Sequence, residues 1–111
     1  MTTKLVDVSR DNEGYLLDPE DWTAELMTET AAEMHTELTD EHLLVIHFIR
    51  RHFAETQTVP QARVVLKFLS AAADENRATR KYLYQLFPYG YGQQACKIAG
   101  MRKPLKLMLD V

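Results

Sequence analysis

The feature that most constrains the fold of this 111-residue chain is a series of apolar patterns with helical spacing, separated by turn residues. Apolar side chains that recur every three or four residues gather on one side of an α-helix and so supply a surface for packing. The pattern occurs in four stretches after residue 18 and, more briefly, around residue 96. We therefore expect an all-α protein, a small orthogonal helical bundle of about five helices.

Capping residues and breakers place the ends of these helices. Asp18 can cap the first helix and Pro19 suits its first position, and Thr39 or Asp40 can cap the second. Gly100 is a natural residue to follow the last one. The first helix carries Trp22, Leu26, Ala31 and Met34 on its apolar side. The others are expected at about residues 40–55, 60–74, 78–87 and 93–99.

A β-hairpin is expected before the first helix. Leu5–Val8 and Tyr15–Leu17 are short stretches that favour strands, and the polar residues between them end in Gly14. At the other end, Pro104 and the basic residues around it indicate an exposed arm, about residues 100–111. The tail residues 105–109 are largely apolar, so we expect the tail to dock on the bundle or on a partner.

Length and composition narrow the class of protein. A chain of this length forms one domain, here expected to span residues 1–111. No apolar run approaches the ~20 residues that span a bilayer, and the N-terminus has no signal-peptide core. We therefore expect a cytoplasmic protein with no membrane segment. With Cys96 as the one cysteine, neither an internal disulfide nor a zinc site of several thiolates is possible.

Charge is distributed unevenly along the chain. Residues 1–45 hold two basic and twelve acidic side chains (−10), whereas residues 46–111 hold eleven basic and four acidic ones (+7). A basic face can attract an acidic protein or RNA, although the pattern slightly favours two solvated faces that complement each other. The candidate partner-binding residues are Arg80, Lys81, Arg102, Lys103 and Lys106.

Two further patterns favour structural roles. His42, His47 and His52 are five residues apart, so successive side chains point about 140° apart around a helix and cannot share one face. We therefore predict no metal site. The helices near residues 40–55 and 60–74 could mimic a helix-turn-helix, but the second is rich in core residues, so direct nucleic-acid binding is not favoured.

Cys96 is the one candidate for thiol chemistry. It lies beside Lys97, and a neighbouring cation can lower the pKa of a thiol and make it reactive. A lone cysteine among apolar neighbours is also commonly a small buried hydrophobe. Position in the sequence leaves both interpretations open.

The residues from Leu86 to Pro104 read LFPYGYGQQACKIAGMRKP. This stretch resembles the C-terminal signature of the TusE/DsrC family, which has LFP, a turn with glycine and proline, a QACKIAG-like helix and a KP arm. The resemblance covers nearly the whole chain, although Gly90-Tyr91-Gly92 departs from the Gly-Pro turn. Further matches are Gly14–Leu16, Trp22, Leu38–Phe53 and Val59–Arg63.

The resemblance implies a helical bundle with a hairpin and a mobile C-terminal arm. It implies a carrier protein, rather than a stand-alone enzyme, that holds sulfur as a persulfide or trisulfide and needs no cofactor. Family members pass sulfur toward tRNA 2-thiouridine synthesis or work with dissimilatory sulfite reductase. The expected partners are therefore proteins of a dissimilatory sulfite reductase-like or Tus-like complex, while the pathway and oligomeric state stay open.

The family's carrier cysteine is missing from the expected position. Cys96 matches the upstream cysteine that some members have, and the carrier position, eleven residues on, holds Leu107. An alkyl side chain cannot form a persulfide. Two hypotheses follow: a sulfur-relay paralogue that binds partners and uses at most Cys96, or a non-catalytic regulator that occupies the relay machinery. A nucleic-acid regulator is a weaker third.

Overall fold

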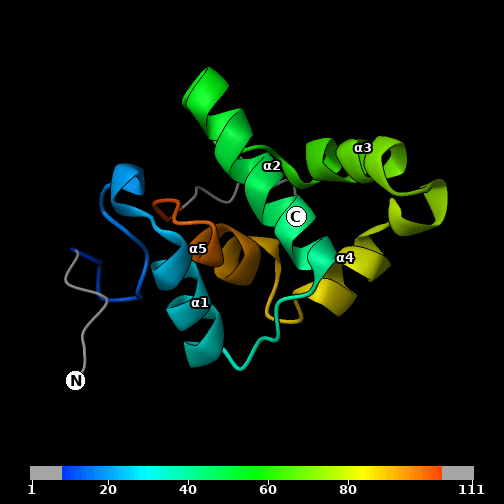
Figure 1. The fold of residues 1–111 in the computed structure, drawn as a ribbon. Coiled ribbons are helices and arrows are strands. Elements are labelled where there is room, and N and C mark those ends of the chain that lie inside the picture. Colours follow the sequence, from blue (N-terminus) through cyan, green and yellow to red (C-terminus); the bar gives the residue numbers. More distant parts are fainter. Residues whose placement is uncertain (1–8, 104–111) are drawn as a thin grey trace.

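Helices dominate the computed structural model, which describes residues 9–103 (Figure 1). The last helical segment lies between α1 and the central helix α2, and α3 and α4 lie on the other side of α2. That last segment is a π-helix, Tyr91–Ala95, continued by α5, Cys96–Ile98. The other helices are α1 (Ala24–Glu33), α2 (Asp40–Thr56), α3 (Ala62–Ala72), α4 (Arg80–Leu86) and two 3-10 turns, Pro19–Asp21 and Glu75–Arg77.

The start of the first helix differs from the prediction. Asp18 does cap a helical turn, accepting a hydrogen bond from the Glu20 amide, but this is the separate 3-10 turn Pro19–Asp21. Trp22 then adopts an extended conformation (ψ 138°), and α1 begins anew with Thr23 as its N-cap. The Thr23 hydroxyl accepts from the Leu26 amide at 3.1 Å, which makes it a second, independent helix start. Trp22 therefore lies between two helical elements rather than on a helix.

The second helix is where the sequence predicts it. Thr39 is the N-cap of α2, and its hydroxyl receives the His42 amide while the His42 ring reaches back to the Thr39 amide. This reciprocal pair is a capping box with histidine in place of the usual Glu or Gln. The helix ends at Thr56, and its C-cap Gln57 has a left-handed backbone (φ 60°) and donates its amide to the Phe53 carbonyl. Both ends of α2 are thus defined by local hydrogen bonds.

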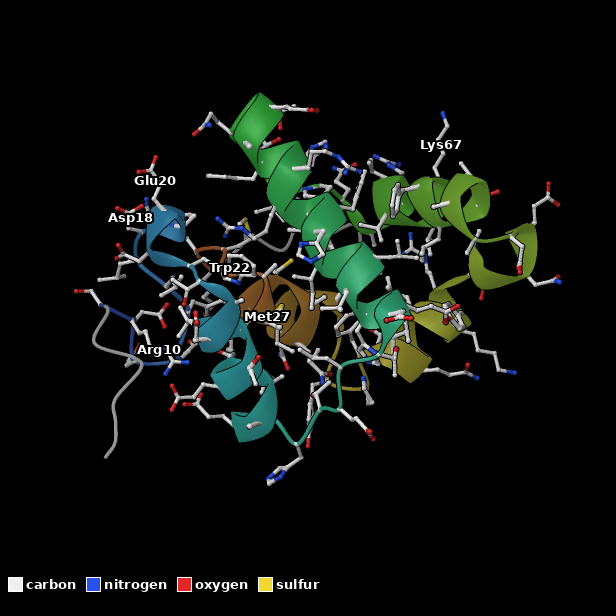
Figure 2. All side chains as sticks on the ribbon, viewed as in Figure 1. Arg10, Asp18, Glu20, Trp22, Met27 and Lys67 are labelled. Carbon is white, nitrogen blue, oxygen red and sulfur yellow. The ribbon has the colours of Figure 1, made fainter. Side chains whose placement is uncertain are left out.

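The core forms where α1, α2, α3 and the last helical segment face one another. In α3, Val65 and Leu69 are fully buried, whereas Ala72 is exposed. Figure 2 shows Met27 between α1 and the last helical segment, while Lys67 points away from the bundle. The buried apolar residues include Met27, Ala31, Val45, Ile46, Ile49, Val65, Leu69, Leu83, Leu86, Phe87, Ile98 and Met101.

The N-terminal hairpin is not confirmed. Its expected first strand lies outside the described residues, and what is described contains one antiparallel bridge, between Arg10 and Leu16. The turn within it is well defined, because the Asp11 carboxylate accepts the amides of Glu13 and Tyr15. The number of five helices is not confirmed either, since α5 is a three-residue continuation of a π-helical turn. The prediction of a mainly helical fold is confirmed.

Candidate functional site

The last helical segment sets the position of Cys96. The segment starts directly after Gly90, and it ends in a left-handed turn at Gly100 (φ 79°). The Gly100 amide donates to the Lys97 carbonyl and the Met101 amide to the Cys96 carbonyl, each at 3.0 Å. These two bonds form the Schellman motif expected of a helix followed by glycine. The sequence thus predicted this helix end correctly.

The Cys96 thiol is sealed inside the core. Its exposed fraction is 0%, and burial raises its pKa to about 12, which a hydrogen bond with Tyr91 opposes only in part. The neighbouring ammonium does not activate it, because the Lys97 Nζ atom lies 5.0 Å from the centre of the Tyr15 ring instead. In this conformation Cys96 is therefore a protonated, hydrogen-bonded core residue. Whether it takes up sulfur in any other state stays a prediction.

Two tyrosines enclose this thiol, and sequence reasoning missed both. The Tyr91 hydroxyl donates to the Pro60 carbonyl, and burial raises its pKa far above the ordinary value, with the neighbouring Cys96 adding to the effect. The Tyr15 hydroxyl donates to the Gly92 carbonyl at 3.1 Å, and burial raises its pKa to about 12. The glycines on either side of Tyr91 indicated a break between two helices. The sequence therefore carried no signal that this residue begins a buried helical turn.

Two side chains, Trp22 and Arg50, fix where the C-terminal segment leaves the bundle. Trp22 donates its indole N–H to the Ile98 carbonyl at 3.0 Å. Arg50 lies 4.3 Å above the Trp22 ring and donates to the carbonyls of Ala99 and Pro19, and its burial lowers its pKa. These bonds tie the last helical segment to α2 and to the 3-10 turn at once.

The predicted basic residues lie in two separate places. Arg80 and Lys81 begin α4, on the opposite side of α2 from the end of the described chain (Figure 1). Arg102 and Lys103 lie at that end, where the Lys103 Nζ atom is 2.9 Å from a Glu13 carboxylate oxygen. Lys106 falls outside the described residues, as do Leu107 and the tail that was expected to dock. The described basic residues therefore do not form one face, and their role in partner binding stays a prediction.

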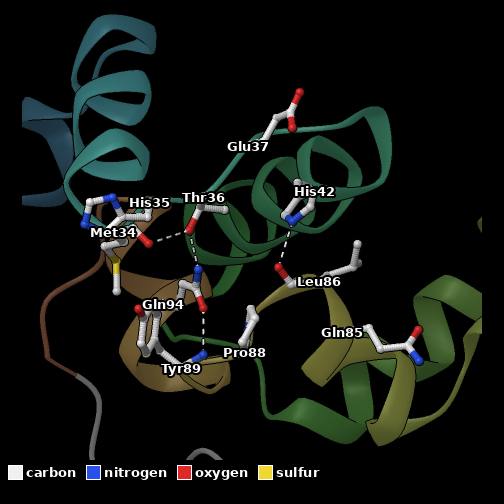
Figure 3. A pocket seen from close by; sticks show the side chains of 10 residues that line it. All are labelled: Met34, His35, Thr36, Glu37, His42, Gln85, Leu86, Pro88, Tyr89 and Gln94. Atoms are coloured by element: carbon white, nitrogen blue, oxygen red, sulfur yellow. Dashed lines mark hydrogen bonds between the residues drawn. The ribbon is translucent and has the colours of Figure 1, made fainter.

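A pocket of about 410 Å³ opens between the loop after α1 and the loop after α4 (Figure 3). Its floor is Gln94, which is 1% exposed. The Gln94 amide donates to the Thr36 hydroxyl and accepts from the Tyr89 amide at 2.8 Å, so one side chain joins both walls. His42 also lines this pocket. No sequence motif pointed to Gln94.

The three histidines of α2 have separate surroundings, as their spacing predicts. His42 is buried, and its Nε2 atom lies 2.7 Å from the Leu86 carbonyl (Figure 3). His47 is exposed at the edge of the Trp22 ring, and His52 lies beside Phe48. Across residues 9–103 no group of three potential metal ligands comes together, and none of the described helices is long and apolar enough to cross a membrane.

Comparison with known proteins finds a matching family and relatives that belong to one group of proteins. The family described as DsrC like protein matches residues 2–108. The sulfurtransferase TusE of Sodalis glossinidius is 37% identical over 102 residues, covering 92% of this chain and 94% of that protein.

Two solved structures share the fold. The oxidized gamma-subunit of the dissimilatory sulfite reductase (DsrC) from Archaeoglobus fulgidus has a TM-score of 0.81 and 31% identity, covering 87% of this chain and 89% of that chain. The NMR structure of Allochromatium vinosum DsrC has a TM-score of 0.79 and 38% identity, covering 90% and 92%.

The fold and the relatives define a small helical protein of the sulfur-relay class. The family match spans nearly the whole sequence, and the relatives match over most of their own length. The chain belongs to the DsrC family.

Proposed function

We propose that this chain is a sulfur-relay protein that works by binding other proteins of the relay, without the two-cysteine persulfide or trisulfide cycle. Its similarity to sulfurtransferase TusE and to DsrC of dissimilatory sulfite reductase supports the relay role. The resemblance implies two pathways, tRNA 2-thiouridine synthesis and dissimilatory sulfite metabolism. The partners are then proteins of a Tus-like or a sulfite reductase-like complex, and the compartment is the cytoplasm. Residues 1–111 act as one domain with a C-terminal arm from about residue 100.

The observation that carries this proposal is the burial of Cys96. A thiol that exchanges sulfur must be reachable and must ionise, because the thiolate is the attacking species. Cys96 has no exposed surface, and burial raises its pKa to about 12, so its thiol stays protonated at neutral pH. Leu107, at the carrier position, has no sulfur to offer. Partner binding is the part of the relay function that these residues leave intact.

A regulatory paralogue is the second candidate, and the same burial favours it. Such a protein occupies the partners of the relay and carries no sulfur at any stage. Both candidates bind relay proteins, and they differ in whether Cys96 accepts sulfur after a partner has bound. Any sulfur that is taken up would be found on Cys96, the one cysteine of the chain.

Intact-mass measurement after incubation with a low-molecular-weight persulfide donor, on the isolated chain and again with a purified relay partner bound, separates these candidates. The donor's outer sulfur would pass to the Cys96 thiolate, leaving a persulfide on the protein and a thiol on the donor. We expect no added sulfur on the folded chain and one added sulfur atom in urea. The Cys96→Ser variant is the control and should gain none in either condition. Sulfur added to the folded wild type alone would make Cys96 a carrier and contradict the proposal.

Titration calorimetry with purified Tus proteins and with purified dissimilatory sulfite reductase tests the relay role itself. Binding of either set supports it, and Cys96→Ser should bind as tightly as the wild type because the thiol is buried. If neither set binds, the relay function is wrong for this chain.

A further inference from the structure

Helix α4 presents a basic and aromatic surface that the site above does not use. Thr79 caps the helix, its hydroxyl accepting the Tyr82 amide at 3.1 Å. Arg80 and Tyr84 are four residues apart and Lys81 is three residues from Tyr84, so all three lie on neighbouring parts of one face. Tyr84 is 54% exposed, among the most exposed large apolar side chains of the described residues. Tyrosine and arginine are the residue types enriched at protein interfaces.

A small cavity lies beside this face. Its volume is about 100 Å³, and Arg80 and Tyr84 line it together with Ala62, Leu83 and Tyr91. The Tyr91 hydroxyl already donates to the Pro60 carbonyl, so it is not waiting for a polar ligand. With a methyl group, an isobutyl group and aromatic rings as walls, the cavity suits one aliphatic side chain. A buried anchor of this kind contributes most of the binding energy at many interfaces.

The residues that line the cavity include one charged side chain, the basic Arg80, and no acidic one. Lys81 is the next basic residue of α4. Nucleic acid would satisfy the charges but has no aliphatic side chain to fill the cavity, whereas an acidic peptide can do both.

We propose that the α4 surface, defined as Arg80, Lys81, Tyr84 and the adjoining cavity, binds an acidic segment of a partner protein. One aliphatic side chain of that segment enters the cavity, and the flanking carboxylates face Arg80 and Lys81. The idea deepens the proposed function, since the partner is a protein of the relay. It assigns two of the five predicted basic residues, those of α4, to the contact and leaves Arg102 and Lys103 outside it.

The test is an NMR titration of the ¹⁵N-labelled full chain with a defined peptide. The probe is an acetylated, amidated pentapeptide with leucine flanked by two glutamates on each side. We expect amide shifts at Ala62, Leu83, Tyr84 and Tyr91, weakening as salt is raised. Replacing the leucine by serine should weaken binding by at least roughly tenfold, because a buried leucine side chain is worth about 1.5–3 kcal/mol. Replacing the glutamates by lysines should abolish it.

Two variants test the two halves of the surface. Ala62→Val fills the cavity from inside without changing charge, and it should abolish the difference between the leucine and serine peptides. Arg80→Gln should weaken the leucine peptide by roughly twofold to fivefold, as expected for an exposed charge pair. Arg102→Gln is the matched control at the other basic site and should leave affinity unchanged. Arg80→Gln is a surface change, so it remains informative even if Ala62→Val fails to fold.

Three results would overturn the inference. Equal binding of the leucine and serine peptides would show that the cavity takes no anchor. Tighter binding of hexauridylate at the same amides would make the surface a nucleic-acid site. Concentration-dependent shifts of those amides without any peptide would make a second copy of the chain the occupant. Because none of these readouts involves sulfur or a purified relay protein, the relay role could fail or stand independently of them.

Discussion

The indole ring of Trp22 packs directly on the backbone of Gly100, inside the left-handed turn that ends the last helical segment. A Cβ atom at Gly100 would overlap the ring, lying 2.8 Å from the Trp22 Cγ atom. The same indole donates to the Ile98 carbonyl. Glycine is therefore required twice at this position, for its positive φ of 79° and for the absence of a side chain.

Replacing Gly100 by alanine should destabilise the protein by about 2–4 kcal/mol, combining left-handed strain with overpacking against Trp22. Gly90→Ala is the matched control, because Gly90 also has a positive φ (105°) but would place its Cβ in open space. That variant should lose only the backbone strain of a conformation that mainly glycine adopts (φ 105°, ψ 154°), about 1–3 kcal/mol. Urea unfolding of both variants gives the comparison. Equal losses of unfolding free energy in the two variants would mean that the Trp22 side chain moves aside at little cost when a Cβ is added at Gly100.

Gln94→Leu should cost about 1–3 kcal/mol, although leucine is apolar and similar in size. The substitution leaves the Tyr89 amide without its acceptor and the Thr36 hydroxyl without its donor. Gln93→Leu, one residue earlier and exposed, should change stability by less than about 0.5 kcal/mol. Thermal unfolding of the two variants tests the assignment. A stable Gln94→Leu protein would show that the walls of the pocket do not depend on this amide.

The helices were predictable where capping and periodicity agree. Helix α2 was predicted correctly from its cap, Thr39, and from its apolar positions. The end of the last helical segment was predicted correctly from Gly100. The break at Trp22 was missed, because Asp18 and Thr23 are both good caps and the sequence does not say that both are used. Tyr91 was missed for a different reason, since two glycines beside it outweighed any helical signal.

The site was only partly predictable. The sequence singled out Cys96 but left its reactivity open, because burial depends on contacts with residues far away along the chain. Tyr15 lies 77 residues before its hydrogen-bond acceptor Gly92, and Arg50 lies 49 residues before Ala99. The basic residues looked like one group because they share the C-terminal third, and the fold divides them between α4 and the chain's end.

His42 should exist as the neutral tautomer with its proton on Nε2. The Thr39 amide can only donate, so the Nδ1 atom that receives it must be unprotonated. The Leu86 carbonyl can only accept, so Nε2 must carry the proton. Long-range ¹H–¹⁵N NMR spectra at pH 8 report the tautomer directly. His47, exposed on the same helix, is the internal control and should show a mixture. A proton on Nδ1 of His42 would contradict the capping box.

Stability should decline above about pH 9, in part because of the buried pair Cys96 and Tyr91. Both pKa values are raised in the folded state, so the native protein keeps protons that the unfolded chain has already released. The stabilising effect is therefore complete below the unfolded pKa values, near 9 for the thiol and 10 for the phenol, and is lost as pH rises. Each such group can contribute at most roughly 1.4 kcal/mol per pH unit to the slope.

Urea unfolding between pH 8 and 11 measures this slope, and Cys96→Ala removes one of its sources. In that variant the decline should begin about one pH unit later, near pH 10, and be shallower, even if the loss of the thiol lowers stability at every pH. Tyr15→Phe tests a less buried group whose pKa is also raised, to about 12. It should lower stability at every pH through the lost bond to the Gly92 carbonyl, and it should change the slope with pH only above about pH 10. An identical pH profile for the wild type and Cys96→Ala would mean that the thiol ionises as readily in the folded protein as in the unfolded chain. In that case Cys96 could react as a thiolate in the folded protein, and the main physical argument against its carrying sulfur would no longer hold.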